Sequence, residues 1–97
     1  MNELFMKYRN SQQITQAVLS ATQDAGMDGI KVTKLMVKSN LSYNRLGSFI
    51  NKLTSSGLIN TIDYDGKNTY IITEKGIMFL QEYEKFSDLA GSFGLEL

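Results

Sequence analysis

Residues 40–59 read NLSYNRLGSFINKLTSSGLI and combine a turn, a helix and the start of a strand. Apolar residues within this stretch recur at the three- and four-residue spacing of one helix face; they are Leu46, Phe49, Ile50 and Leu53. The spacing predicts a helix over residues 43–56 that is half buried against its neighbours. Ser42 is a candidate N-terminal cap, and Gly57 stands where a left-handed residue often ends a helix.

A longer helix is predicted near the N-terminus. It follows a cap at Asn10 or Ser11 and stops at Gly26. Its apolar face consists of Ile14, Ala17, Val18, Ala21 and Ala25. Two arrangements remain open for the preceding residues Leu4, Phe5 and Tyr8, which either extend this helix backward or form a separate arm.

A brief helix is predicted between these two. Residues 29–32 form a short extended segment, and Thr33 is then a plausible cap for a helix that reaches about Ser39. Residues 40–42 form a turn in which Leu41 can fill a gap in the core. The side chains expected to face inward from the brief helix are Val32, Leu35 and Met36.

A hairpin and a final helix follow residue 57. Residues 58–64 and 69–72 are rich in types that favour strands, and the intervening Asp65-Gly66-Lys67-Asn68 is a strong turn signal. Thr73 then caps a helix that continues to at least Phe86.

This order of elements predicts an α+β, mostly helical fold. Three helices, a two-stranded hairpin wing and a C-terminal helix make the winged helix-turn-helix arrangement. The length fits one domain over residues 1–97, in which residues 74–97 would be a C-terminal dimerisation helix and tail.

Three short motifs carry a resemblance to a known family. They are NLSY at residues 40–43, GLI at residues 57–59 and TEKG at residues 73–76. In this order and spacing they resemble the archaeal winged-helix family that includes the ten-kilodalton chromatin-type DNA-binding proteins. The resemblance covers roughly residues 10–90.

The resemblance implies DNA binding and dimerisation through the last helix. It also places Ser42, Tyr43 and Arg45 at the start of the DNA-recognition helix. This sequence departs from the family in its neutral overall charge and in a final helix that ends near Gly91 and Gly94. Both departures favour a regulator over an abundant DNA-coating protein.

The composition argues against an enzyme or an exported protein. The chain contains neither Cys nor His, which removes disulfides, thiolate zinc sites and the commonest general base. No apolar run approaches the roughly 18 residues of a membrane span, and residues 1–10 lack the order of a secretory signal. We therefore expect a cytoplasmic, non-enzymatic protein with no cofactor, no metal and no membrane contact.

Charge is unevenly distributed, although ten bases and ten acids give no net charge. Residues 1–28 carry −1, residues 29–68 carry +4 and residues 69–97 carry −3. Five bases and no acid occur from Lys31 to Lys52. Such a run indicates a surface for a polyanion, although it can also be an ordinary solvated face.

The helix over residues 43–56 presents a polar, acid-poor face. At roughly 21 Å long it fits the major groove of DNA, which is about 12 Å wide. Asn44 and Asn51 could read adenine, and Arg45 could reach guanine or a phosphate. With the flanking bases, the helix start and the hairpin tip, the candidate DNA-binding residues are Lys31, Lys34, Lys38, Ser42, Tyr43, Asn44, Arg45, Ser48, Asn51, Lys52, Lys67 and Asn68.

These residues also have plainer interpretations. Tyr43 would pack under the hairpin, the amides and lysines would be ordinary surface residues, and Gly47 would allow close packing with the first helix. Asp63 and Asp65 near the hairpin tip would repel phosphate, so we expect a modest contribution from the wing.

The last helix carries an aromatic seam. Its members alternate at spacings of four and three residues and are Phe79, Tyr83, Phe86, Ala90, Phe93 and Leu97. Phe79 and Tyr83 could simply cover the domain's own core, whereas the remainder are hard to bury in one small domain. We expect a homodimer that binds double-stranded DNA, with Phe79, Tyr83, Phe86, Ala90 and Phe93 at its interface. The alternative is a winged helix used for protein–protein contact in a larger assembly.

Overall fold

The computed structural model describes residues 9–95, apart from the side chain of Tyr64. Its helices are α2 (Ser11–Ala25), α3 (Val32–Ser39), α4 (Tyr43–Ser55) and α5 (Glu74–Ser92), with a short 3-10 turn η1 (Gly26–Asp28). Its strands are β1 (Ile30–Lys31), β2 (Ile59–Tyr64) and β3 (Lys67–Ile72). The predicted α+β, mostly helical order is confirmed. The expectations for Leu4, Phe5, Tyr8 and Leu97 fall outside the described residues.

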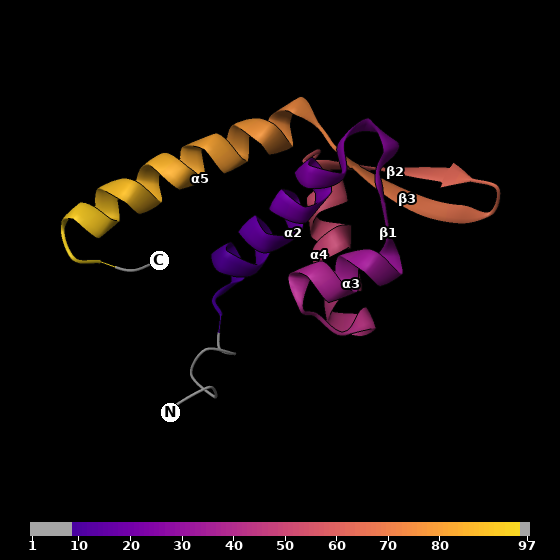
Figure 1. Ribbon diagram of the computed structural model, residues 1–97, viewed down its shortest axis with the longest axis horizontal. Coiled ribbons are helices and arrows are strands. Elements are labelled where there is room, and N and C mark those ends of the chain that lie inside the picture. The colour runs from indigo at the N-terminus through magenta and orange to yellow at the C-terminus, as the bar shows by residue number, and fades with distance from the viewer. Residues whose placement is uncertain (1–8, 96–97) are drawn as a thin grey trace.

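The chain is elongated because two elements project from a central body (Figure 1). Helices α2, α3 and α4 pack together, the β2–β3 hairpin leaves on one side, and α5 runs out on the opposite side. The overall extents are 47 × 30 × 20 Å. The hairpin and the far end of α5 therefore lie far apart, on opposite sides of the body.

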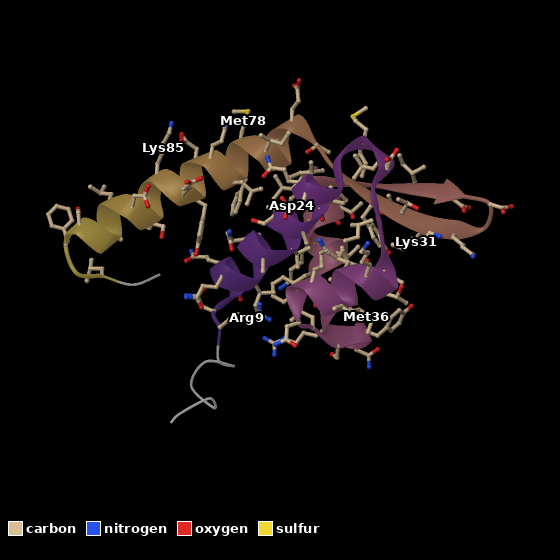
Figure 2. The ribbon with its side chains drawn as sticks, in the orientation of Figure 1. Arg9, Asp24, Lys31, Met36, Met78 and Lys85 are labelled. Carbon is tan, nitrogen blue, oxygen red and sulfur yellow. The ribbon has the colours of Figure 1, made fainter. Side chains whose placement is uncertain are left out.

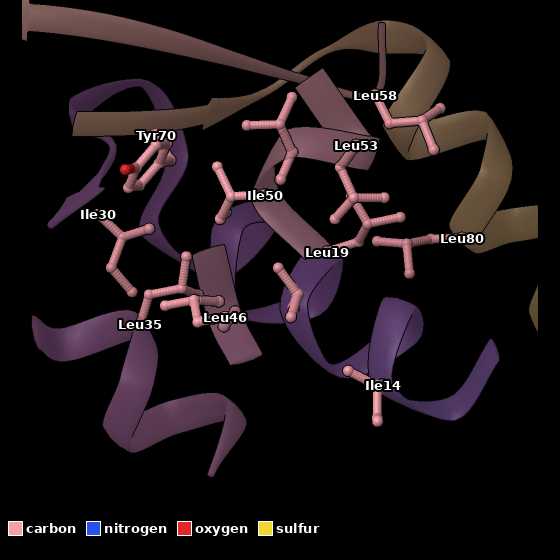
Figure 3. Packing of buried hydrophobic residues seen from close by; sticks show 13 residues of the cluster. Ile14, Leu19, Ile30, Leu35, Leu46, Ile50, Leu53, Leu58, Tyr70 and Leu80 are labelled. Atoms are coloured by element: carbon pink, nitrogen blue, oxygen red, sulfur yellow. The ribbon is translucent and has the colours of Figure 1, made fainter. Parts of the chain in front are cut away.

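The core lies where the three central helices meet the sheet and the first turns of α5 (Figure 3). Its fully buried apolar side chains include Leu19, Leu35, Leu46 and Ile59. Leu19 and Thr22 lie outside the predicted apolar face of α2, yet both are buried because α2 contacts α3, α5 and β3. The Thr22 hydroxyl donates to the Val18 carbonyl at 2.8 Å, which satisfies it inside the core.

The predicted ends of α2 and α4 are confirmed by their hydrogen bonds. At the start of α2, the Asn10 side chain accepts from the Gln13 amide, and the Gln13 side chain accepts from the Asn10 amide. This reciprocal capping box selects Asn10 over Ser11 as the cap. In α4, the Ser42 hydroxyl accepts from the Arg45 amide at 3.2 Å, and Gly57 follows the helix with φ of 77°.

Helix α3 begins earlier than the sequence predicts. Lys31 occupies the N-cap position without a side-chain cap bond, so the predicted cap at Thr33 is wrong. The reason is a third strand: Ile30 pairs with Tyr70, and Lys31 pairs with Thr69. The sheet order is therefore β1-β3-β2, and the chain leaves extended geometry directly after Lys31.

The hairpin turn is tighter than predicted. Asp65 and Gly66 both have positive φ, 55° and 76°, and Tyr64 pairs with Lys67 across them. An Asp-Gly pair suits such a two-residue turn because both positions require left-handed backbone. Lys67 and Asn68 consequently belong to β3 rather than to the turn.

Thr73 joins the hairpin to α5. Its hydroxyl accepts from the Gly76 amide at 3.0 Å and donates to the Gly57 carbonyl at 2.6 Å. A Cβ at Gly76 would collide with the Leu58 carbonyl oxygen and the Ile72 side chain. The base of α5 is thus packed directly against the start of β2 and the end of β3.

Candidate nucleic-acid interface

The candidate DNA-binding residues share one property: all are exposed in the structure. They are Lys31, Lys34, Lys38, Ser42, Tyr43, Asn44, Arg45, Ser48, Asn51, Lys52, Lys67 and Asn68. The Tyr43 side chain is 65% exposed, so it does not pack beneath the hairpin. The polar face of α4 therefore remains open to solvent, as an interface with a polyanion requires.

A hollow of about 560 Å³ lies between α4 and the sheet. Its α4 wall carries Tyr43, Asn44, Gly47, Ser48 and Asn51. The remaining lining comes from Val32, Leu46, Ile50 and Tyr70. The structure therefore brings both candidate adenine-reading amides, Asn44 and Asn51, to one groove.

A second hollow of about 400 Å³ adjoins the first toward the hairpin. The two share Val32, Tyr43 and Tyr70, and the second adds Lys31, Thr33, Lys67 and Asn68. Among the described residues, none that lines either hollow is acidic. Together they form a groove, the α4–sheet groove, that carries positive charge at its hairpin end.

The lysines of α3 line a third hollow, which faces the end of α2. Lys31, Lys34 and Lys38 meet Asp24 there, in a volume of about 450 Å³. Lys31 belongs to this hollow and to the α4–sheet groove, and Figure 2 places it at the start of α3, beside the hairpin. The basic surface consequently continues from the hairpin along α3.

Arg45 and Lys52 occupy a separate position. They line none of these three hollows, although both side chains are exposed on α4. The Lys52 ammonium lies 5.8 Å from the centre of the Phe49 ring, a cation–π distance that draws it toward its own helix. The site is therefore a groove with a basic α3 flank, and these two bases stand apart from both.

Tyr70 stays neutral within the α4–sheet groove. Burial raises the pKa of its phenol above the usual 10.0, the nearby Tyr43 adds to the rise, and a hydrogen bond with the Asn68 side chain opposes it. An uncharged phenol does not repel phosphate. The inner surface of the groove is therefore compatible with a polyanion at physiological pH.

Arg9 helps to hold the turn before α4, a role that the sequence alone did not predict. Its guanidinium Nη2 donates to the carbonyl oxygens of Ser39 at 2.8 Å and Asn40 at 3.2 Å. These carbonyls lie at the C-terminal end of α3, where a cation is favoured by the helix dipole. Because the contact spans 30 residues of sequence, no local pattern reveals it. Arg9 thereby fixes the turn that leads into α4.

The aromatic residues of α5 divide into two groups. Phe79 packs against the core, and its ring stacks on Tyr83 with centroids 6.4 Å apart. Tyr83 lines a hollow between α2 and α5 together with Gln16 and Ser20. The plainer interpretation, that Phe79 and Tyr83 cover the domain itself, therefore agrees with their positions.

Farther along α5, the seam is only partly as expected. Phe86 and Phe93 are 57% and 73% exposed, whereas Ala90 is only 5% exposed. Ala90, expected to be hard to bury within one small domain, is therefore buried in the single chain, and the chain turns back beside it, where the Leu95 amide donates to the Ala90 carbonyl. Leu89 and Leu95, which the seam omits, are exposed.

Comparison with known proteins places this architecture in a family. The sequence pattern of the winged helix-turn-helix family matches residues 8–91. The chain belongs to the winged helix-turn-helix family. None of the curated protein sequences matches this chain.

Solved winged-helix structures share its fold. Sso10a-2, a DNA-binding protein from Sulfolobus solfataricus, superposes with a TM-score of 0.74 at 19% identity, covering 88% of this chain and 85% of that one. The regulator BldR from the same organism gives 0.69 at 19%, covering 82% and 58%. A mutant of MepR from S. aureus, bound to an oligodeoxyribonucleotide, gives 0.70 at 13%, covering 87% and 62%. The expected resemblance to archaeal winged-helix proteins is confirmed, although this chain spans less than two thirds of BldR and MepR.

No helix within residues 9–95 has the length and apolar character needed to cross a membrane. Within the same range, no cluster of three acidic, His or Cys residues could hold a metal ion.

Proposed function

We propose that this winged-helix domain, over residues 1–97, is a cytoplasmic transcription regulator that binds double-stranded DNA sequence-specifically as a homodimer. The observation that carries the proposal is the open, acid-poor α4–sheet groove with its basic α3 flank. In this proposal α4 enters the major groove. The protein has no catalytic role and needs neither a cofactor nor a metal.

The chemistry of α4 suits the reading of base edges. Asn44 and Asn51 each offer a donor and an acceptor, the pair that adenine presents in the major groove. Arg45 offers parallel donors to guanine or to a phosphate. Ser48 is small and exposed between them and permits a close approach.

Phosphate contacts would come from the surrounding bases. Lys31, Lys34 and Lys38 follow one edge of the domain, and Lys67 stands beside the hairpin turn. Ser42 and Tyr43 add hydroxyls at the start of α4, where the helix dipole favours an anion. Such contacts position the protein on the duplex, and base contacts then give specificity.

The far half of α5 supports the homodimer. Phe86 and Leu89 lie one turn apart on one face of α5, Phe93 follows the helix as its C-cap residue, and all three are exposed. A second copy related by a two-fold axis would cover this apolar face with an identical one. The adjacent acids Glu82, Glu84 and Asp88 make this end of α5 unsuited to phosphate. The two copies would then present α4 to successive major grooves.

A salt titration of duplex binding by gel shift tests the proposal. If about four phosphates are neutralised per subunit, log affinity falls against log salt with a slope near −3.6, doubled in a dimer. Replacing Lys38→Ala and Arg45→Ala together should abolish binding while the circular dichroism of the fold is retained. The matched control is Lys75→Ala with Lys85→Ala, which removes the same charge from α5.

A protein–protein module remains the second candidate. The exposed apolar residues Phe86, Leu89, Phe93 and Leu95 and the neutral net charge favour it. If the chain is such a module, its gel-shift titration should show no duplex binding that weakens with salt in the expected way. The same titration therefore separates the two functions.

A further inference from the structure

Gly47 lies inside α4, yet the described chain gives no reason for a glycine there. Its φ is not among the left-handed values, so its backbone is open to any residue. Apart from its own stretch of helix backbone, a Cβ at this position would meet no atom within 4 Å. Glycine weakens a helix interior relative to alanine because it loses more backbone freedom on folding. The interpretation that Gly47 allows close packing with α2 is therefore wrong.

At other positions the fold itself requires a glycine. Gly76 is required because a side chain would strike the Leu58 carbonyl and Ile72. Gly29 combines φ of 78° with close contacts from Thr69 and Ile71. Gly47 differs from both, because no contact within the described chain requires a glycine there and its backbone is left bare on that side.

The surroundings of Gly47 identify the kind of molecule that approaches. Gly47 is one helical turn from Tyr43 and one from Asn51, and all three line the α4–sheet groove. The groove continues past Tyr70 to Lys31 and Lys67. The hydroxyls of Tyr43 and Tyr70 and the cations at one end of this acid-free groove suit a sugar–phosphate strand, whose bases would then face Asn44 and Asn51.

We propose that one sugar–phosphate strand of the duplex runs through the α4–sheet groove and touches the bare backbone of α4 at Gly47. The inference rests on the proposed function, in which α4 enters the major groove and Lys67 beside the hairpin turn contacts phosphate. If the hairpin then reaches the adjacent minor groove, the strand between the two grooves passes between α4 and the hairpin. Sugar atoms lie against Gly47, and the phosphates lie toward Lys31 and Lys67. A methyl group at position 47 stands in the path of the strand.

The test is Gly47→Ala, for which stability and binding move in opposite directions. The helix gains propensity, so the Tm rises by about 5 °C. Duplex affinity falls by about tenfold because the added methyl overpacks the contact. The loss is the same on every duplex sequence, and the salt slope is unchanged, since a sugar contact carries neither base information nor charge.

Two further variants calibrate the result. Gly91→Ala adds a methyl to another helical glycine with no neighbour within 4 Å, on α5, and leaves duplex affinity unchanged. Lys67→Ala makes the salt slope less steep by about 0.9 per subunit, because one phosphate contact is lost. The Gly47 effect is thereby separated from general changes in helix stability and from loss of charge.

Three results overturn the inference while the proposed function stands, provided that the wild-type chain binds duplex DNA. They are undiminished binding by Gly47→Ala, a loss confined to particular base sequences, and a fall in Tm. Absence of salt-dependent duplex binding by the wild-type chain would instead overturn the proposed function, and this inference with it.

Discussion

The exposed face of α4 and the far half of α5 are both helix surfaces that the described chain leaves open, yet their chemistry is opposite. The α4 face carries amides, hydroxyls and bases and contains no acid. Beyond Tyr83, α5 and its C-cap residue expose Phe86, Leu89 and Phe93 beside Glu84 and Asp88. One surface suits a hydrated polyanion, and the other suits an apolar partner.

The difference shows why net charge is a poor guide to this protein. Zero overall charge arises from a basic middle segment and an acidic final segment. The fold places the hairpin and the far end of α5 at opposite sides of the body (Figure 1). Segregated charge of this kind steers each surface toward its own partner while the chain as a whole stays neutral.

The largest expected effect comes from substitutions that remove the apolar surface at the far end of α5. Phe86→Asp combined with Phe93→Asp should reduce the solution mass to that of one 10.9 kDa chain. Duplex affinity should fall by about 100-fold, because the second α4 no longer binds as part of the same particle. Light scattering and gel shifts measure the two consequences.

Met78→Asp is the matched control for that experiment. Met78 is also exposed on α5 and lies near its base, on the outer edge of the helix (Figure 2). This variant should keep the wild-type mass and affinity. If the variant with Phe86→Asp and Phe93→Asp kept the mass of a dimer, the proposal that this surface binds a second copy would be contradicted.

A second experiment compares the stability cost of a substitution at the packed base of α5 with that of the same substitution at its exposed far end. Gly76→Ala should lower the free energy of unfolding by about 2 kcal/mol, because the methyl group overpacks against Leu58 and Ile72. Chemical denaturation measures the change, with Gly91→Ala as the control that lowers nothing. Equal stability of the two variants would contradict the tight junction.

The smallest expected effect concerns the two arginines beside the turn into α4. Arg9→Ala removes hydrogen bonds to the Ser39 and Asn40 carbonyls and should lower the free energy of unfolding by about 1 kcal/mol. Arg45→Ala should weaken duplex binding with little change in stability, because its side chain is exposed. Urea denaturation compares the two, and an unchanged midpoint for Arg9→Ala would show that the turn holds without it.

Local sequence was sufficient for most of the elements. The bounds of α4 follow from Ser42, the apolar spacing and Gly57, and the hairpin follows from Asp65-Gly66. Each of these signals acts within a few residues, where backbone preference and capping decide the conformation. For the same reason the exposure of the α4 polar face could be predicted from periodicity alone.

Features that join distant residues could not be predicted. Pairing of Ile30 with Tyr70 adds β1 to the sheet and moves the start of α3. The Arg9 contact with Ser39 and the close approach at Gly76 depend on how elements dock. Local propensity does not predict how elements dock against one another, since tertiary packing overrides it. The groove shared by α4 and the sheet was missed for this reason.

Thr73 leaves no flexible linker between the hairpin and α5, because one hydroxyl caps the helix and also bonds the Gly57 carbonyl. In a pair joined through α5, the distance between the two copies of α4 is then set by stiff structure. Operators are expected to be sensitive to helical phasing. Inserting about five base pairs between half-sites turns one of them to the far side of the duplex, beyond reach of a rigid dimer.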